Sequence, residues 1–431
     1  MLRSRLKRFL VMLAVGITVA GCGKDTTAPE ETTPETPTPE TPAPPPTPRT
    51  ESDLYLAAAR LAWKYIENAT QSSTGLAKAT YTFQYATAWD IASQIGGTYS
   101  AHELGIIDDA NYDGRIKKIL STLQSVALFD NAGFNRFYDT ETGRMVRRDF
   151  TLSSTGFGWS TTDIGRLLIW LKILAVKQPQ YAAQAQAIVN RLNYSKLINN
   201  GTLMGTDVAA NGVRSTYQET GLGYEQYAAA GFTLWNHRPS SSMDATSHAT
   251  QVDVLGVKVY IDTRGEARTT SEPYVMMGME TGWYNAALAD QAQRVLAAQQ
   301  ARYDQRKILT MVTEDALPDT PPYFFYYYSV YRAGKGSFAV EGPDKGTFVD
   351  QPRWVSSKAT FAWRALVPTP YTLVALNAVQ SAAIPGQGWG GGVLESNLQP
   401  TGGASLNTAG VILEAALYQK SGHSFLSQPI S

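Results

Sequence analysis

Residues 219–232 read ETGLGYEQYAAAGF, a glycine-punctuated turn that runs into the start of a helix. The small residues at positions 228–231 let another backbone approach closely, which predicts an inner helix of a helical assembly. Glu225 lies near the start of this helix, between Tyr224 and Tyr227. We therefore expect Glu225 to point into a central cavity lined by both tyrosines, where burial would raise its pKa as a general acid requires. A carboxylate that only stabilises a helix start is the alternative.

Helical periodicity extends over most of the remaining chain. Helices are predicted over residues 53–68, 87–104, 111–127, 161–177, 180–192, 224–236, 281–303, 321–332, 356–366, 371–383 and 407–420. Ser52 is a plausible cap for the first helix, and Thr369 followed by Pro370 marks the start of another. The β-branched alternation over residues 252–262 predicts a small β excursion. Helices of similar length joined by uneven loops indicate an all-α toroid of helical hairpins, a single domain over residues 51–431.

The N-terminal residues follow a different pattern. Basic side chains within residues 3–8 precede an apolar stretch from Phe9 to Ala20, and Cys22, the only cysteine of the chain, follows. This order predicts a lipoprotein signal peptide over residues 1–21 and a lipid-modified Cys22. The apolar stretch is short for a membrane span, although an uncleaved transmembrane helix is the alternative. We expect a lipid anchor in the membrane of a bacterial cell envelope, and Gly23 favours the outer membrane.

The segment after the cysteine has the composition of a linker. Nine of the 25 residues in 26–50 are proline, interleaved with threonine and glutamate. Such a segment has no apolar periodicity from which to build a core. Residues 22–50 are therefore predicted to be an acylated cysteine followed by an extended stalk.

The composition excludes several classes of function. The 37 Lys and Arg residues balance 37 Asp and Glu residues, so nucleic acid is not the expected partner. The single cysteine precedes the folded domain, and the four histidines are too far apart for a short metal-ligand spacing. Neither a phosphate-binding loop nor a dinucleotide fingerprint is present. We expect no cofactor and no metal.

Aromatic side chains indicate a sugar ligand. The chain has nine Trp, 23 Tyr and 14 Phe residues, and several stand beside carboxylates, as in Trp89-Asp90. Aromatic rings stack on the C–H faces of sugars, while carboxylates accept hydrogen bonds from sugar hydroxyls. A polysaccharide or oligosaccharide is therefore the expected partner.

Three further segments carry candidate catalytic carboxylates. Residues 87–93 and 160–168 each place an aspartate, Asp90 or Asp163, in the first turn of a predicted helix. The glycine-rich segment 386–397 carries Glu395. Helix capping, an intrahelical pair between Asp163 and Arg166, or a flexible turn would explain these residues without a catalytic role.

Together with Thr313-Glu314-Asp315 and Asn407-Thr408, these segments resemble the bacterial family known as domain of unknown function 3131, over roughly residues 54–420. That family is similar to glucoamylase-like (α/α)6 toroids, which include bacterial β-1,2-glucanases. The resemblance implies the same fold and places Asp163 and Glu225 on functional positions.

These observations predict a membrane-anchored glycoside hydrolase that cleaves a glucan. Glu225 would protonate the glycosidic oxygen, while Asp163, Asp90 or Glu395 activates a water molecule. The predicted substrate-binding residues are Trp89, Tyr224, Tyr227, Arg166 and Trp389. A non-catalytic glycan-binding lipoprotein is the alternative. A polysaccharide lyase on the same fold is a third hypothesis, against which the few histidines and the lack of a basic cleft signature count.

Overall fold

The computed structural model describes residues 50–264, 267–317, 324–342, 347–426 and 430, which belong to one compact unit. The predicted signal peptide, Cys22 and nearly all of the predicted stalk lie outside the described residues. Within the described ranges, every helix is too short or too polar to cross a lipid bilayer.

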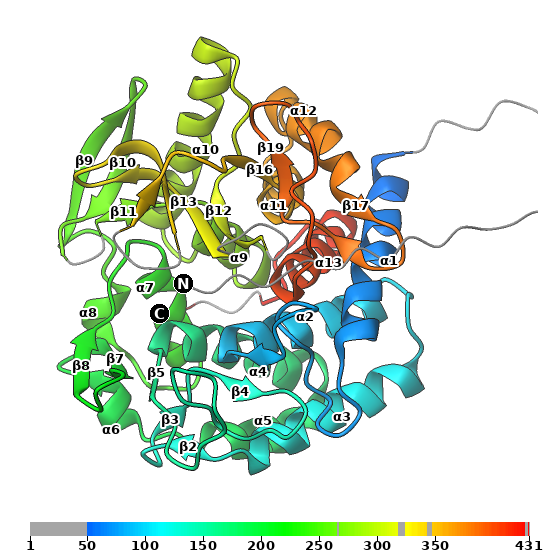
Figure 1. The fold of residues 1–431 in the computed structure, drawn as a ribbon, viewed down its shortest axis with the longest axis vertical. Helices are drawn as coiled ribbons and strands as arrows, with labels where there is room; N and C mark the ends of the chain where they lie inside the picture. Colours follow the sequence, from blue (N-terminus) through cyan, green and yellow to red (C-terminus); the bar gives the residue numbers. More distant parts are fainter. Residues whose placement is uncertain (1–49, 265–266, 318–323, 343–346, 427–429, 431) are drawn as a thin grey trace, which may run out of the picture. The chain divides into compact units, whose positions relative to one another are not determined.

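Six helices pack side by side in a ring, each against the next, with the last closing against the first (Figure 1). In ring order they are α2 (Ala88–Glu103), α4 (Thr161–Lys177), α7 (Tyr224–Thr233), α9 (Glu272–Glu280), α11 (Ser357–Leu366) and α13 (Leu406–Ser421). These helices occur in this order along the sequence. Closure of the ring therefore packs α13, the last helix of the domain, against α2, the second.

Other helices flank this ring. They are α1 (Glu51–Ala69), α3 (Asp109–Ser125), α5 (Ala182–Val189), α10 (Ala286–Arg306) and α12 (Pro370–Val379). Between α7 and α9 the chain instead forms the short α8 (Ser240–Met243) and a β-hairpin, β9 (Ala249–Val254) with β10 (Val257–Asp262). The remaining helical segments are α6 (Tyr194–Leu197) and two single 3₁₀ turns, Pro179–Tyr181 and Gln380–Ala382.

Glycine allows the closest approach within the ring. A Cβ atom on Gly231 of α7 would lie 2.0 Å from the carbonyl oxygen of Gly165 in α4, and one on Gly165 would lie 2.5 Å from the Cα of Ala228. The two backbones therefore touch where only hydrogen atoms fit. This contact confirms the prediction that residues 228–231 pack tightly within an inner helix.

Ser or Thr side chains cap four of the inner helices. Thr87 forms a reciprocal capping box with Asp90 at the start of α2, and Ser160 accepts a hydrogen bond from the amide of Asp163 in α4. Ser356 and Ser405 cap α11 and α13 in the same way. These side chains satisfy amide groups that the first helical turn leaves without a partner.

The segments between the helices contain strands. The prediction of a helix-rich fold is therefore confirmed, but the fold is not all-α. The larger sheet contains β11 (Arg268–Thr269), β12 (Thr313–Ala316), β13 (Phe324–Arg332), β14 (Gly336–Glu341) and β15 (Phe348–Val349), all antiparallel. A second antiparallel sheet contains β5 (Gly158–Trp159), β6 (Ile198–Asn199), β7 (Thr202–Val208) and β8 (Arg214–Gln218).

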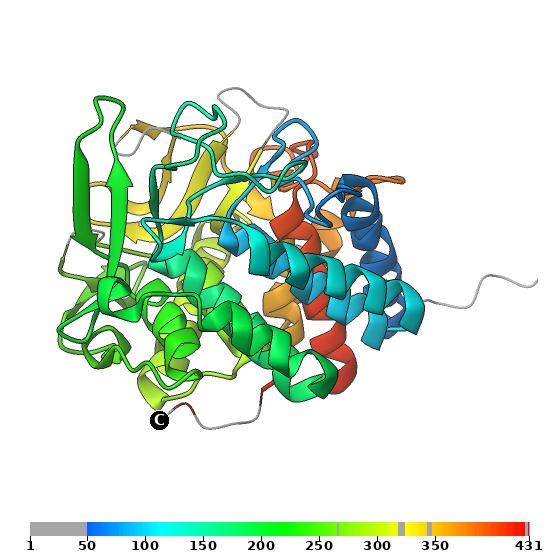
Figure 2. The ribbon, with the colours of Figure 1, turned by 90° about the horizontal axis from the view of Figure 1, so that it is seen from below.

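The remaining strands form short antiparallel pairs. They are β1 (Tyr85–Ala86) with β4 (Tyr138–Asp139), β2 (Leu128–Phe129) with β3 (Gly133–Phe134), β16 (Trp354–Ser356) with β19 (Gly392–Leu394), and β17 (Ala383–Ile384) with β18 (Gly388–Trp389). Figure 2 shows strands and long loops gathered on one side of the helices.

One helix prediction is wrong, and another places the start of its helix too early. The helix predicted over residues 321–332 is strand β13 where the structure describes it, because its run of aromatic residues favours a sheet. The helix predicted over 281–303 begins at Ala286, and a separate helix, α9, precedes it. Thr50, rather than Ser52, caps α1, while the predicted Thr369 cap and the β excursion over 252–262 are confirmed.

Candidate functional site

The candidate site lies where the first turns of the inner helices meet the loops. Asn407 at the start of α13 accepts a hydrogen bond from Ser93 of α2 over 3.0 Å and donates one to Glu272 of α9 over 2.8 Å. Lys358 of α11 lies 2.9 Å from the same Glu272 carboxylate. Side chains from four inner helices therefore converge at one end of the ring.

Three carboxyl groups, Asp90, Asp163 and Glu219, form what we term the acidic cluster. Asp163 lies in the first turn of α4, where its Oδ1 accepts a hydrogen bond from the Ser160 hydroxyl over 3.1 Å. Glu219 follows strand β8, and its Oε1 accepts a hydrogen bond from the amide of Thr161 over 3.2 Å. The hairpin that ends in Glu219 thus brings a carboxylate to the start of α4.

Burial raises the pKa of Asp163 from 3.8 to about 7. The guanidinium of Arg136 opposes this shift, while the nearby carboxylates of Glu219 and Asp90 reinforce it. A carboxyl group with a pKa near neutrality can both hold and release a proton at physiological pH. Asp163 therefore has the property that the sequence analysis expected of a general acid.

Asp90 occupies a more constrained position. Its Oδ2 accepts hydrogen bonds from the amide and the hydroxyl of Thr87, both at 2.9 Å. Burial raises the pKa of Asp90, and the two Thr87 hydrogen bonds and the positive charge of Arg166 lower it. Helix capping therefore explains much of the position of Asp90, as the non-catalytic alternative stated.

Arg166 lies directly beneath an aromatic side chain. It is fully buried, and its guanidinium carbon is 4.9 Å from the ring centre of Trp89. The Trp89 ring is half-buried and lies 5.9 Å from Tyr224 and 5.8 Å from Tyr227, measured between ring centres. The structure thus brings together four of the five predicted substrate-binding residues.

The charge of Arg166 is balanced inside the ring. Arg166 pairs with Glu280 over 3.5 Å and with Glu414 over 3.2 Å, and not with Asp163. Tyr227 donates a hydrogen bond to Glu280. Burial and the adjacent Glu280 raise the pKa of Glu414 well above its usual range. One positive charge thus stands between two carboxyl groups, and the raised pKa favours the neutral form of Glu414.

A second ionic group, which the sequence did not predict, lies beside the site. Glu272 accepts hydrogen bonds from Lys358 and from the Thr313 hydroxyl, each over 2.9 Å, as well as from Asn407. Although burial opposes it, Lys358 is the largest of several influences that hold the pKa of Glu272 below its usual value. A Glu-Pro pair opening a helix was the available signal, but helix α9 itself was not predicted.

Strand β12 adds a further charged pair. Glu314 lies 3.1 Å from the guanidinium of Arg268, which in turn lies 5.5 Å from the centre of the Tyr224 ring. The amide of Glu314 donates a hydrogen bond to Glu272 over 3.2 Å. Through this strand the Tyr224 side of the site is joined to the buried Glu272.

Glu225 lies on a different face of α7 from the one expected. Its carboxylate accepts a hydrogen bond from Ser242 over 2.6 Å and forms an ion pair with Arg264, which also pairs with Asp262. Burial raises the pKa of Glu225, and Arg264 and Ser242 lower it. These contacts join α7 to the β9–β10 segment and give Glu225 a structural role. Its catalytic role stays a prediction.

Two residues of the glycine-rich segment lie away from the acidic cluster. Trp389 is buried, donates a hydrogen bond to the carbonyl of Ala58 over 3.0 Å and packs against Phe361. Glu395 pairs with Arg302 of helix α10 over 2.9 Å. The Trp389 ring fills the space between α1 and α11, which favours a structural role, and its predicted contact with substrate stays a prediction. The position of Glu395 favours a structural ion pair.

The described ranges contain no group of three or more His, Cys, Asp or Glu side chains arranged to hold a metal ion. The groups that the described side chains bring to the site are carboxyl groups, guanidinium groups, the Lys358 ammonium group and aromatic rings.

A comparison with protein families matches the family described as "Protein of unknown function (DUF3131)" over residues 57–422. The chain belongs to this family. A search of curated proteins finds no match.

Solved structures share the fold at low sequence identity. A candidate glucoamylase from Bacteroides uniformis superposes with a TM-score of 0.62 at 12% identity, over 89% of this chain and 96% of that one. The endo-β-1,2-glucanase from Chitinophaga pinensis, solved with sophorotriose and glucose, gives 0.58 at 14% identity, over 89% and 96%. The endo-β-1,2-glucanase from Talaromyces funiculosus, solved with sophorose, gives 0.58 at 10% identity, over 86% and 85%. The DUF3131 chain is therefore helix-rich and glucoamylase-like in fold.

Proposed function

We propose that this DUF3131 protein is a glycoside hydrolase that cleaves a glucan at the acidic cluster, on a variant of the (α/α)6 toroid. The observation that carries the proposal is Asp163, whose pKa of about 7 arises beside two other carboxyl groups at the mouth of the helical ring. The fold shared with β-1,2-glucanases supports a glucan as the substrate class.

In the proposed mechanism, protonated Asp163 donates its proton to the glycosidic oxygen as the bond to the anomeric carbon breaks. Glu219 takes a proton from the water molecule that attacks this carbon. The amide of Thr161 and the charge of Arg136 both favour a negative charge on Glu219, as the role of base requires. Asp163, one of the candidate bases predicted from the sequence, is therefore the acid in this mechanism.

The aromatic side chains would hold the sugar. Trp89 lies over Arg166 with Tyr224 beside it, and the Arg268–Glu314 pair lies next to Tyr224. Rings offer C–H stacking, and the charged groups offer hydrogen bonds to hydroxyls. Trp89 directly precedes Asp90 in α2, so this group adjoins the acidic cluster.

The proposal is tested by measuring reducing-end release from a panel of bacterial glucans, with β-1,2-glucan included. A hydrolase shortens at least one glucan and creates a new reducing end. The glycan-binding alternative retains glucans without shortening them, and a lyase leaves an unsaturated product that absorbs ultraviolet light.

The lipid anchor on Cys22 and an address in the outer membrane of the cell envelope also remain proposals. Their support is the sequence pattern alone. An anchored hydrolase on a stalk could reach a glycan within the envelope.

A further inference from the structure

Aromatic side chains gather on the segments that lead into α2 and α4. Four of them are partly exposed and form what we term the aromatic platform: Phe83, Tyr85, Phe137 and Phe150. Contacting pairs within the platform have ring centres 4.9–5.7 Å apart. The buried Phe157 stacks on Phe137, with 6.3 Å between the ring centres. Among the described residues, the contiguous hydrophobic core of the domain includes none of these five rings.

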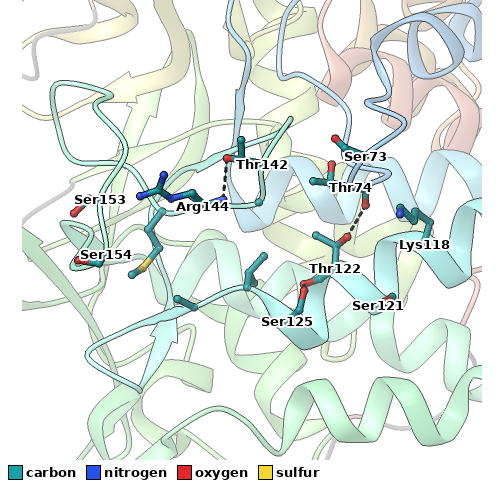
Figure 3. A pocket seen from close by; sticks show the side chains of 14 residues that line it. Ser73, Thr74, Lys118, Ser121, Thr122, Ser125, Thr142, Arg144, Ser153 and Ser154 are labelled. Carbon is teal, nitrogen blue, oxygen red and sulfur yellow. Dashed lines mark hydrogen bonds between the residues drawn. The ribbon is translucent and has the colours of Figure 1, made fainter.

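Phe150 lies at the tip of a tight hairpin that spans residues 146–152. Its amide donates a hydrogen bond to the carbonyl of Arg147, and the Arg147 amide donates one to the carbonyl of Thr151, each over 2.9 Å. Ser153, at the base of this hairpin, is labelled in Figure 3. These two hydrogen bonds define a three-residue hairpin loop in which Phe150 is the last residue.

The backbone of Phe150 is held in a left-handed conformation, with φ of +61°. Glycine suits this position of the loop, whereas a bulky side chain adopts it only at a cost in stability. Tyr85 holds the turn in place, because its hydroxyl donates a hydrogen bond to the carbonyl of Phe150 over 3.1 Å. An aromatic ring outside the core is thus kept at a position that favours glycine, and such strain is typical of functional sites.

The aromatic platform adjoins the acidic cluster along the chain. Tyr85 belongs to β1, and α2, which carries Asp90 in its first turn, begins three residues later. Phe137 directly follows Arg136, whose charge acts on the carboxyl group of Asp163. Figure 2 shows the segments before α2 and α4 on the side of the helices where the strands gather. The platform therefore lies on the same side of the domain as the candidate site.

We propose that the aromatic platform binds a distant part of the glucan chain that is cleaved at the acidic cluster. Sugar rings stack through their C–H faces on aromatic rings, and a neutral glucan requires no charged partner there. A chain that reaches from the acidic cluster to the platform is longer than one that fills the cluster alone, so the substrate is a long glucan. This inference rests on the proposed hydrolysis and adds the length of the substrate to it.

Calorimetric titration of the full chain tests the proposal with two probes, long-chain β-1,2-glucan and sophorotriose. All titrations use the Asp163→Asn background, in which the proposed mechanism lacks its acid. The long chain should bind more tightly than sophorotriose, because only the long chain can reach the platform. The decisive comparison is between variants at Phe150.

Phe150→Gly should weaken binding of the long chain at least about fivefold and change that of sophorotriose less than about twofold, because it removes one stacking ring from the platform alone. Glycine adopts the left-handed backbone freely, so this variant keeps the hairpin. Phe150→Asn, which also tolerates this backbone, should have the same effect. Phe150→Tyr keeps the ring and should retain the affinity of the background.

The matched control is Tyr303→Ala. It removes a partly exposed ring from α10 that contacts Tyr371, with 5.7 Å between the ring centres, away from the platform. Its affinities for both probes should equal those of the background. Circular dichroism and the melting temperature check that every variant is folded.

Three results would overturn the proposal. The first is that neither probe binds. The second is that folded Phe150→Gly and Phe150→Asn bind the long chain like the background. The third is that they weaken both probes alike, as a purely structural role of Phe150 predicts.

Reducing-end release by the parent protein separates this inference from the proposed hydrolysis. Cleavage of β-1,2-glucan together with any of these three results refutes the platform alone. Binding of the long chain that depends on Phe150, without cleavage of any glucan, refutes the hydrolase and the link between the platform and cleavage, and leaves a surface that only binds glycan.

Discussion

The amide of Thr161 donates a hydrogen bond to the carboxylate of Glu219 over 3.2 Å, although 58 residues separate them. This contact fastens the segment after β8 to the first turn of α4. It also brings Glu219 close enough to Asp163 to raise the pKa of that carboxyl group. Burial is the largest cause of the raised pKa of Asp163, and this contact between two distant parts of the sequence adds to it.

Asp163→Asn should stabilise the folded protein at alkaline pH. The pKa of Asp163 is raised on folding, so the folded state binds its proton more tightly and loses stability as pH rises from about 4 to about 7. Asn removes this penalty, which is on the order of 1–4 kcal/mol above pH 7. Urea denaturation at pH 4, 6 and 8 measures the difference from the parent. A stability gain of Asp163→Asn that does not grow with pH would contradict the raised pKa of Asp163.

The control for this measurement is Asp149→Asn. Hydrogen bonds from Thr151 lower the pKa of Asp149, and its carboxyl group is exposed. Its substitution should give no stability gain with rising pH.

Glu225→Gln should reduce stability more than activity. The carboxylate pairs with Arg264 and Ser242, so its loss weakens the junction between α7 and the β9–β10 segment. Removing one partner of such a buried pair costs about 1–3 kcal/mol. We expect the folded variant to keep hydrolysis within about tenfold, short of the 10²–10⁴-fold that a general acid contributes. The original hypothesis that Glu225 is the acid predicts the reverse: a stable variant with hydrolysis lowered at least about 10²-fold.

Arg166→Met should destabilise the helical ring by about 3–5 kcal/mol, because it leaves Glu280 and Glu414 buried without their cation. Glu414→Gln is the contrasting variant. Burial and the adjacent Glu280 raise the pKa of Glu414 well above its usual range, which favours its neutral form, so the neutral amide should cost less than about 2 kcal/mol. Urea denaturation at pH 7 compares the two. Equal losses would contradict the expectation drawn from the raised pKa of Glu414.

Cys22→Ser should move the protein from the membrane fraction to the soluble fraction without changing the melting temperature of the domain. Only Cys22 supplies a thiol for the diacylglyceryl group. Fractionation of cells that express each form, with immunodetection, provides the measurement. Retention of the variant in the membrane would instead favour an uncleaved signal anchor.

Local sequence signals predicted most of the helical fold. Ser160, Thr87 and Thr369 mark helix starts through short-range hydrogen bonds, which a single sequence can reveal. The helix prediction over 321–332 was wrong because the aromatic residues there favour a sheet. The pairing of this strand with its neighbours is a long-range property that local spacing does not reveal. Helix α9 was missed because all nine of its residues are buried, so it has no polar face to give a pattern.

The site was predictable in part. Asp163, Asp90, Trp89 and Arg166 were found because each lies beside a helix start or an aromatic residue. The facing direction of Glu225 was not predictable, because Arg264 and Ser242 reach it from segments that follow it in the chain. Glu272 and Lys358 are 86 residues apart, and no local pattern joins them.

The pH dependence of glucan hydrolysis tests the central claim most directly. Reducing-end release from β-1,2-glucan should be measured between pH 4 and pH 9 for the parent protein and for Asp163→Asn. The account predicts that parent activity falls as pH rises through about 7, where Asp163 loses its proton, and that Asp163→Asn lowers the rate at least about 10²-fold while remaining folded. A folded Asp163→Asn variant with the activity and pH profile of the parent would contradict the assignment of Asp163 as the acid.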